Sequence, residues 1–247
     1  MKYTFQPIGI IHSCFREKFG IPRQPGLVTA AEGRLEILPP YNRAEAFRTL
    51  QDYSHLWLVF VFHAALRQHW SATVRPPRLG GNQRVGVFAT RSPYRPNPLG
   101  LSRVELRAID YSGQGVNLLL SGIDLLDQTP VLDIKPYLPY TDAIADAKAG
   151  MASCCPGKPI ELSFSEQAEG LLAGLDRGFA QHLRLLIEQV LEQDPRPAYL
   201  KDSRTRRSFG MQLYDYDIRW RVSGDVLEVT SIGFCGTHSA EKPSGPE

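Results

Sequence analysis

The sequence has 247 residues, 43% hydrophobic and 22% charged, a composition typical of a folded globular protein and unlike that of a disordered chain. A chain of this length has room for a large core and a smaller second one, so we expect two domains. The net charge is only +2. No apolar run approaches the roughly 20 residues that span a bilayer, and residues 1–7 lack a signal-peptide core. We therefore expect a cytoplasmic protein without membrane contact.

Short apolar runs bounded by Gly and Pro predict strands in the first half of the chain. The expected strands are residues 5–11, 34–38, 56–62, 84–90, 101–109 and 116–123. The run 56–62 is apolar and aromatic enough to be covered on both faces, and Asn42 can cap a short helix through Leu50. Many short strands with few helices predict a mostly β fold, in which residues 1–149 form a barrel-like domain.

The composition changes near residue 150, where residues 150–159 are typical of a linker. Beyond it we predict a strand at 160–165 and a helix at 166–193, which the prolines of 194–197 end. The runs 209–222 and 225–232 predict a hairpin around Ser223-Gly224. Residues 160–235 are therefore predicted to form a small α+β domain, and the polar residues 236–247 a disordered tail.

Basic residues are concentrated in the first domain. Residues 1–150 contain 17 Lys or Arg and 12 Asp or Glu, whereas the remainder contains 11 and 14. Within 67–107, eight arginines accompany one acid, Glu105. This asymmetry indicates an anionic partner, although a solvated surface is the alternative. The candidate RNA-binding residues are Arg75, Arg78 and Arg95 in this stretch, and Lys201, Arg204, Arg206 and Arg207 in the second domain.

Three irregular segments are candidates for a ligand site. The loop 75–102 combines arginines with prolines and glycines, which suits an anionic or polar ligand. Residues 22–26 form a turn whose Gln24 amide could bind a ligand edge, or an ordinary connection. Asp133, Lys135 and Tyr137 alternate and so point to one side of a strand, where they form either a base-binding cluster or a structural ion pair.

Other common site patterns are missing from the sequence. His55, His63 and His69 have no standard zinc spacing, so we predict no metal site. The chain contains no phosphate loop, dinucleotide fingerprint or nucleophile elbow. The four cysteines, Cys14, Cys154, Cys155 and Cys235, are expected to be reduced and non-catalytic.

Several ordered motifs identify a relationship. They are residues 22–27 (PRQPGL), 52–57 (DYSHLW), 86–93 (GVFATRSP), 95–102 (RPNPLGLS), 129–130 (TP) and 133–137 (DIKPY), with 194–199 (DPRPAY) in the second domain. On these motifs the chain resembles the TsaA/YaeB-like family of tRNA methyltransferases. One departure is Gln128, at a position where the family pattern leads us to expect glycine.

The resemblance implies a barrel-like enzyme that binds S-adenosylmethionine, works as a homodimer and methylates the exocyclic nitrogen of N6-threonylcarbamoyladenosine beside the anticodon of tRNA. By the same resemblance, the donor-binding residues are Arg23, Gln24, Pro25, Phe62, His63, Arg91, Leu101, Asp124, Leu125, Leu126 and Asp127.

The acceptor nitrogen must lose a proton, and we hypothesise that Asp133 or Tyr137, beside Lys135, assists. Two alternatives stay open at this point. One is a non-catalytic arginine-rich RNA-binding module, and the other is a small-molecule methyltransferase with an acidic substrate.

Overall fold

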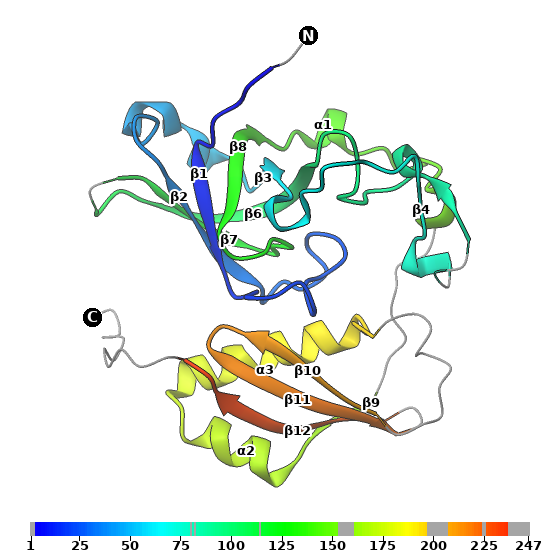
Figure 1. Ribbon diagram of the computed structural model, residues 1–247. Coiled ribbons are helices and arrows are strands. Elements are labelled where there is room, and N and C mark those ends of the chain that lie inside the picture. The colour runs from blue at the N-terminus through cyan, green and yellow to red at the C-terminus, as the bar shows by residue number, and fades with distance from the viewer. Residues whose placement is uncertain are drawn as a thin grey trace.

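The computed structural model describes residues 3–79, 81, 83–113, 115–152, 161–196, 207–223 and 226–236 (Figure 1). Six strands of this described part close into a barrel with antiparallel neighbours. In their order around the barrel they are β1 (Gly9–Ser13), β2 (Glu32–Ile37), β7 (Asn117–Ser121), β6 (Leu99–Asp110), β3 (His55–Val61) and β8 (Thr129–Pro136). The predicted mostly β, barrel-like fold is confirmed.

Strand β3 contributes one face to the core and one to the outside of the barrel. Leu56, Leu58 and Phe60 are buried, while the residues between them are half-buried. The prediction that both faces are covered is therefore wrong. A strand of a barrel has an inner and an outer face, and the aromatic and β-branched residues on the outer face of β3 remain accessible.

Two further predictions for the first domain are wrong. The run 84–90 forms only the two-residue strand β5 (Val85–Gly86), which pairs with β4 (Thr73–Val74) outside the barrel, followed by a 3-10 turn at Val87–Ala89. Instead of a helix after Asn42, the chain makes 3-10 turns at Ala44–Phe47 and Leu50–Asp52, because Thr49 between them has a left-handed φ of 64°. A short helix α1 (Pro139–Asp142) follows β8.

In its described residues, the C-terminal unit contains a sheet with the strand order β10-β11-β12-β9 and two helices. Its strands are β9 (Glu161–Phe164), β10 (Arg207–Leu213), β11 (Tyr216–Ser223) and β12 (Val226–Phe234). The predicted hairpin run 209–222 is in fact two strands, since Tyr214, with φ of 52°, begins a tight turn between β10 and β11. The predicted hairpin between β11 and β12 is present.

The predicted helix 166–193 is divided into α2 (Glu166–Ala173) and α3 (Arg177–Glu192). Gly174 ends α2, and the Asp176 carboxylate accepts a hydrogen bond from the Phe179 amide at 3.0 Å, which caps α3. Glycine is a poor helix former and aspartate a good N-cap, so the break follows from these two residues.

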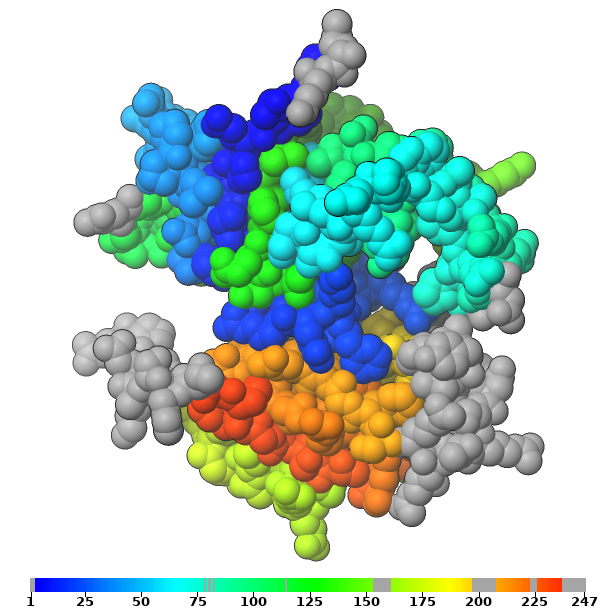
Figure 2. Space-filling model, viewed as in Figure 1, coloured from blue at the N-terminus to red at the C-terminus, as the bar shows by residue number. Residues whose placement is uncertain are grey.

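The segment that follows β1 joins the two units. Phe15 pairs with Leu213 of β10, the Tyr214 amide donates to the Cys14 carbonyl at 2.8 Å, and Phe19 stacks on Trp220. Figure 2 shows the blue atoms of this segment lying between the barrel and the orange strands. One continuous cluster of buried apolar side chains extends through both units, so they pack as a single body.

Candidate active site

A cavity of about 540 Å³ opens on the outer face of strands β3 and β6. This volume lies within the range of roughly 300–1,000 Å³ that is usual for small-molecule sites. Trp57, Val59 and Val61 of β3 and Leu99 and Leu101 of β6 form an apolar wall. Polar side chains reach the cavity from the loops, so it combines an apolar surface with a few charged groups.

Two glycines hold the loops of the cavity together. The Gly26 amide donates to the Gly122 carbonyl at 2.8 Å, and these residues have positive φ values of 77° and 69°. A Cβ on Gly122 would lie 3.2 Å from the Gly26 Cα. The close backbone approach therefore favours glycine at both positions, and it brings the turn 22–26 next to Asp124.

The polar groups of the cavity interact with one another. The Arg91 guanidinium donates to the Gln24 side-chain oxygen, which connects the proline-rich loop with the turn 22–26. The Asp124 carboxylate accepts a hydrogen bond from the Ser102 hydroxyl. Burial raises the pKa of Asp124 to about 6, although the Ser102 hydrogen bond and the charge of Arg91 act in the opposite direction. Asp124 therefore changes charge near neutral pH.

Most of the residues predicted to bind the methyl donor meet at this cavity. Those that line it are Arg23, Gln24, Phe62, His63, Arg91, Leu101, Asp124, Leu125 and Leu126. Pro25 belongs to the same turn but does not line the cavity. Asp127 has a structural partner set instead: its carboxylate accepts a hydrogen bond from the Ser13 amide at 2.9 Å and pairs with Arg16. Its predicted donor contact therefore has no support from its position.

The sequence prediction missed the outer wall of β3, namely Trp57, Val59 and Val61, and also Lys18 and Thr129. The two-residue alternation of strand 55–61 could have placed the wall residues on one face. Lys18 gave no such signal, because its ammonium reaches the cavity rim from a loop by donating to the Ala64 carbonyl at 2.6 Å.

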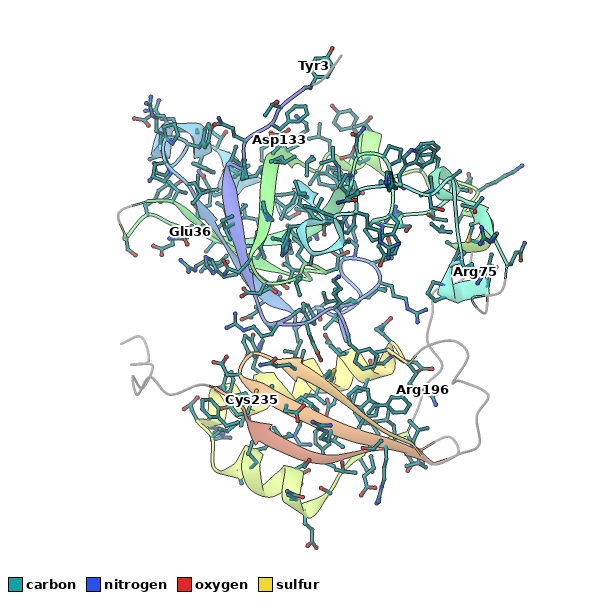
Figure 3. All side chains as sticks on the ribbon, viewed as in Figure 1. Tyr3, Glu36, Arg75, Asp133, Arg196 and Cys235 are labelled. Carbon is teal, nitrogen blue, oxygen red and sulfur yellow. The ribbon has the colours of Figure 1, made fainter. Side chains whose placement is uncertain are left out.

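A second cluster continues the same outer face away from the cavity. Trp57 and Val59 line the cavity and pair across the sheet with Lys135 and Asp133 of β8. The Tyr137 ring, just beyond β8, lies 5.8 Å from that of Trp57 and 5.6 Å from the Arg103 guanidinium. The structure thus brings the predicted acceptor residues to the edge of the cavity (Asp133 is labelled in Figure 3).

Within this cluster, both carboxylate oxygens of Asp133 have a hydrogen-bonding partner. One carboxylate oxygen lies 2.8 Å from the Lys135 ammonium and the other accepts a hydrogen bond from the Ile134 amide at 2.9 Å. The Trp57 indole donates to the Asp142 carboxylate at 2.8 Å, which fixes the ring between the cavity and Tyr137. The Leu138 amide donates to the same oxygen, and these hydrogen bonds hold the pKa of Asp142 below its usual range.

Gln128 occupies a turn that explains why glycine is expected there. Its φ is 64°, a left-handed conformation that costs about 1–2 kcal/mol for a residue with a Cβ. The backbone amide of Gln128 donates to the Ile11 carbonyl at 2.8 Å, and its side-chain Nε2 lies 3.2 Å from Nδ1 of His12. These hydrogen bonds hold the turn in place, so the neighbouring loop that carries Asp124 keeps its path.

The predicted RNA-binding arginines differ in their surroundings. Arg75 is exposed on the segment that carries β4, whereas the Arg95 guanidinium donates to carbonyls of its own loop, at Ser92 and Thr90. Figure 3 shows Arg75 at a distance from the barrel strands. Arg78 lies in a 3-10 turn at Pro77–Leu79 and Arg207 begins β10, while Lys201, Arg204 and Arg206 lie outside the described residues.

Among the described residues that line the cavity, there is neither a cluster of metal ligands nor a thiol. Among the described residues there is no group of three or more His, Cys, Asp or Glu that could hold a metal ion. Burial raises the pKa of the Cys14 thiol to about 12, and Cys235 is exposed. Cys154 and Cys155 lie outside the described part of the chain. Nor is any helix in that part long and apolar enough to cross a membrane.

Two family models match the chain. The model of the tRNA-methyltransferase O N-terminal domain matches residues 10–143, and that of the TrmO C-terminal domain matches residues 157–234. The chain belongs to the tRNA-methyltransferase O family. The cavity and the cluster around Tyr137 both fall within the part that matches the N-terminal domain of tRNA-methyltransferase O.

Relatives in the tRNA-methyltransferase O family cover nearly the whole chain. A tRNA (adenine(37)-N6)-methyltransferase of Escherichia coli K12 is 48% identical over 93% of this chain and 97% of its own. A putative S-adenosylmethionine-dependent methyltransferase, RcsF, of Pseudomonas aeruginosa PAO1 is 51% identical over 94% and 98%. The crystal structure of TrmO from Pseudomonas aeruginosa matches with a TM-score of 0.77 at 43% identity, over 94% of this chain and 99% of that one.

Proposed function

We propose that the protein transfers a methyl group from S-adenosylmethionine to the exocyclic nitrogen of an adenosine next to the anticodon of tRNA, with N6-threonylcarbamoyladenosine as the substrate nucleoside. The observation that carries this proposal is the position of the cavity. It lies between a segment rich in arginine and the aromatic cluster of Tyr137 and Trp57, in a chain of the tRNA-methyltransferase O family.

The residues of the cavity fit the chemistry of S-adenosylmethionine, which supplies a methyl group already activated on a sulfonium. Val59, Val61 and Leu101 offer an apolar surface to an adenine ring. Arg91 offers a guanidinium to a carboxylate, and Asp124 offers a carboxylate to hydroxyls or a positive charge. The protein therefore has mainly to align the two reactants and exclude water.

Methylation of the adenosine needs catalytic assistance from the protein, because the acceptor nitrogen is conjugated and must lose a proton. We infer that Tyr137 binds the acceptor base and that the Asp133–Lys135 pair lies close to that nitrogen, which gives the proton an acceptor. An aspartate that accepts this proton has to loosen its contact with Lys135. The adjacent ammonium would also stabilise negative charge on the acceptor.

Arg91→Ala is expected to weaken S-adenosylmethionine binding about tenfold, because one charge-assisted hydrogen bond is lost at a partly exposed site. Calorimetric titration of the donor without RNA measures this. The melting temperature is expected to change little, since Arg91 is exposed and its partner Gln24 stays solvated. A large loss of stability with intact donor affinity would show that Arg91 only stabilises the loop.

Binding of S-adenosylmethionine is expected to become about tenfold tighter as the pH rises from 5 to 7, because Asp124 ionises over this range. The carboxylate form is the better partner for hydroxyl donors and positive charge. The linked effect on stability has the opposite sign: the folded state holds this proton more tightly than the unfolded chain, so the free energy of unfolding falls as the pH rises from about 4 to about 6.

Asp124→Asn is the matched control for this pH dependence, since it keeps a hydrogen-bonding group of nearly the same shape and removes the titration. The donor affinity of the variant is expected to be flat between pH 5 and 7. If the variant retains the slope of the wild type, another group is responsible and Asp124 has no charged role in donor binding.

The decisive assay follows label from methyl-labelled S-adenosylmethionine into bulk tRNA with and without the threonylcarbamoyl modification. Incorporation only into modified tRNA is the expected result. Donor binding without transfer to either tRNA would favour a small-molecule methyltransferase, and RNA binding without donor binding a non-catalytic module. A steep dependence of affinity on salt separates RNA from a small acidic substrate, since each neutralised phosphate releases counterions.

We also propose that the protein is cytoplasmic and, from the family resemblance, that it is a homodimer. From the basic run in an otherwise acidic second domain we propose that Lys201, Arg204, Arg206 and Arg207 contact the tRNA backbone. Leu99 and Leu101 of the cavity wall are 37% and 55% exposed, so a second subunit that covers the mouth of the cavity would bury apolar surface there. Sedimentation analysis tests the dimer. Alanine at the four basic positions should reduce the salt dependence of tRNA binding.

A further inference from the structure

The chain between β3 and β6 leaves the barrel as a projecting arm, defined here as residues 66–90. Figure 1 shows it extending from the barrel, with β4 near its outer end. The residues that flank the arm at its two ends, called its roots here, line the cavity. They are His63 and Ala65 before the arm and Arg91 and Pro93 after it. A ligand that occupies the cavity mouth therefore lies next to the arm.

The arm exposes two large aromatic rings. Trp70 is 53% exposed and Phe88 is 75% exposed, and their centroids lie 6.4 Å apart with an angle of 30° between the planes. The backbone beneath them is fixed, because β4 pairs with β5 and the amide of buried Val87 donates to the Ala72 carbonyl at 3.0 Å. Adjacent exposed aromatic rings on an ordered segment are typical of an interaction surface.

The arm is also strongly positive. Its residues 66–90 contain four arginines and no Asp or Glu, and the stretch without an acidic residue extends on to residue 104. Among the described side chains, none of the arginines between 67 and 103 forms an ion pair with a carboxylate, whereas Arg16, Arg34 and Arg107 of the same unit do. The contacts of the arm arginines are neutral: Arg67 lies over the Tyr94 ring at 3.7 Å, and Arg84 donates to the Thr73 hydroxyl.

We propose that Trp70 and Phe88 form a stacking platform for unpaired nucleotides of the RNA substrate, with Arg75 and Arg84 binding the adjoining phosphates. This inference deepens the proposed function and rests on it. Bases in single-stranded loops stack on aromatic side chains, and arginines track the backbone between them. Because both roots of the arm line the cavity, the platform would hold nucleotides that flank the adenosine to be methylated.

The charge of the arm favours RNA over a second copy of this chain. Contact between two such arms would bring their unpaired guanidinium groups together, and like charges repel. An RNA loop supplies both the flat apolar surface and the negative charge that the arm lacks. Duplex RNA fits less well, because its bases are already stacked on one another.

The test measures the binding of a labelled tRNA anticodon stem-loop, without S-adenosylmethionine, to the full chain. Trp70→Ala and Phe88→Ala are each expected to weaken binding about tenfold. Neither is expected to change the affinity for a fully paired RNA duplex with the same number of phosphates. Arg75→Ala is expected to weaken both complexes. Phe5→Ala is the matched control, since Phe5 is 68% exposed outside the arm and its loss should affect neither.

The outcomes separate this inference from the proposed function. If either alanine variant binds the stem-loop as tightly as the wild type, Trp70 and Phe88 are not a stacking platform. A change in oligomeric state with unchanged RNA affinity would make the arm a contact between copies and would also overturn the inference. Trp70→Phe should retain most of the affinity if stacking is the cause. Absence of methyl transfer by the wild type would reject the proposed function and leave the binding result intact.

Discussion

Gly100→Ala is expected to destabilise the protein by about 1–3 kcal/mol, which for a chain of this size lowers the melting temperature by roughly 2–4 °C per kcal/mol. Gly100 lies directly opposite Phe60 in the β3–β6 pair, and a Cβ there would lie 2.1 Å from the Phe60 ring. The ring has little room to move, because it is 5% exposed and packs edge-on against Phe62 at 4.9 Å.

The same substitution is expected to weaken donor binding, since Gly100, Phe60 and Phe62 all line the cavity. Thermal unfolding and donor titration measure the two effects. Gly86→Ala is the matched control: Gly86 has a φ of −60°, and an added Cβ would meet nothing within 4 Å. Its stability should be unchanged or slightly higher. Equal melting temperatures for both variants would mean that Phe60 repacks freely and that Gly100 is not required.

The barrel could be predicted from the sequence because its strands carry local signals. Alternating apolar residues and turn residues mark β1, β2, β6 and β7 whichever partners they find. The run 84–90 has the same composition but lies outside the barrel, so only Val85 and Gly86 find a partner strand. Composition does not tell which apolar run will be paired, and this is why that prediction was wrong.

The break between α2 and α3 was predictable in principle and shows how local signals compete. Hydrophobic periodicity continues across residues 166–193 and favours one helix. Gly174 and the capping aspartate Asp176 favour a stop and a restart, and the structure follows them. Thr49, Gln128 and Tyr214 illustrate the opposite case, because their positive φ values are set by surrounding contacts that no propensity reveals.

The polar residues of the cavity could be predicted from motifs, whereas their arrangement could not. The hydrogen bond between Arg91 and Gln24 joins residues 67 positions apart, and the raised pKa of Asp124 depends on burial by loops from several strands. Trp57 carried no predicted role, yet it is the residue that connects the cavity with Tyr137. Such connections arise only when the barrel closes.

Tyr137→Ala is expected to lower kcat/KM for tRNA by roughly 30-fold to 5,000-fold, the loss of a stacking surface and a hydroxyl together being worth about 2–5 kcal/mol. The Tyr137 ring packs against Trp57 and lies 5.6 Å from the Arg103 guanidinium, so it is held in place to receive a base. Tyr137→Phe keeps the ring and is expected to lose only about tenfold through the missing hydroxyl.

Single-turnover methyl transfer, with the donor affinity measured separately, tests this expectation. The donor affinity should be unchanged in both Tyr137 variants, because Tyr137 does not line the cavity, whereas Trp57 beside it does. Tyr111→Ala is the matched control, a tyrosine 47% exposed just beyond the far end of β6, and should keep full activity. If Tyr137→Ala instead weakens donor binding with turnover per bound donor intact, Tyr137 acts by supporting Trp57 in the cavity wall. The acceptor would then have to bind elsewhere on the barrel.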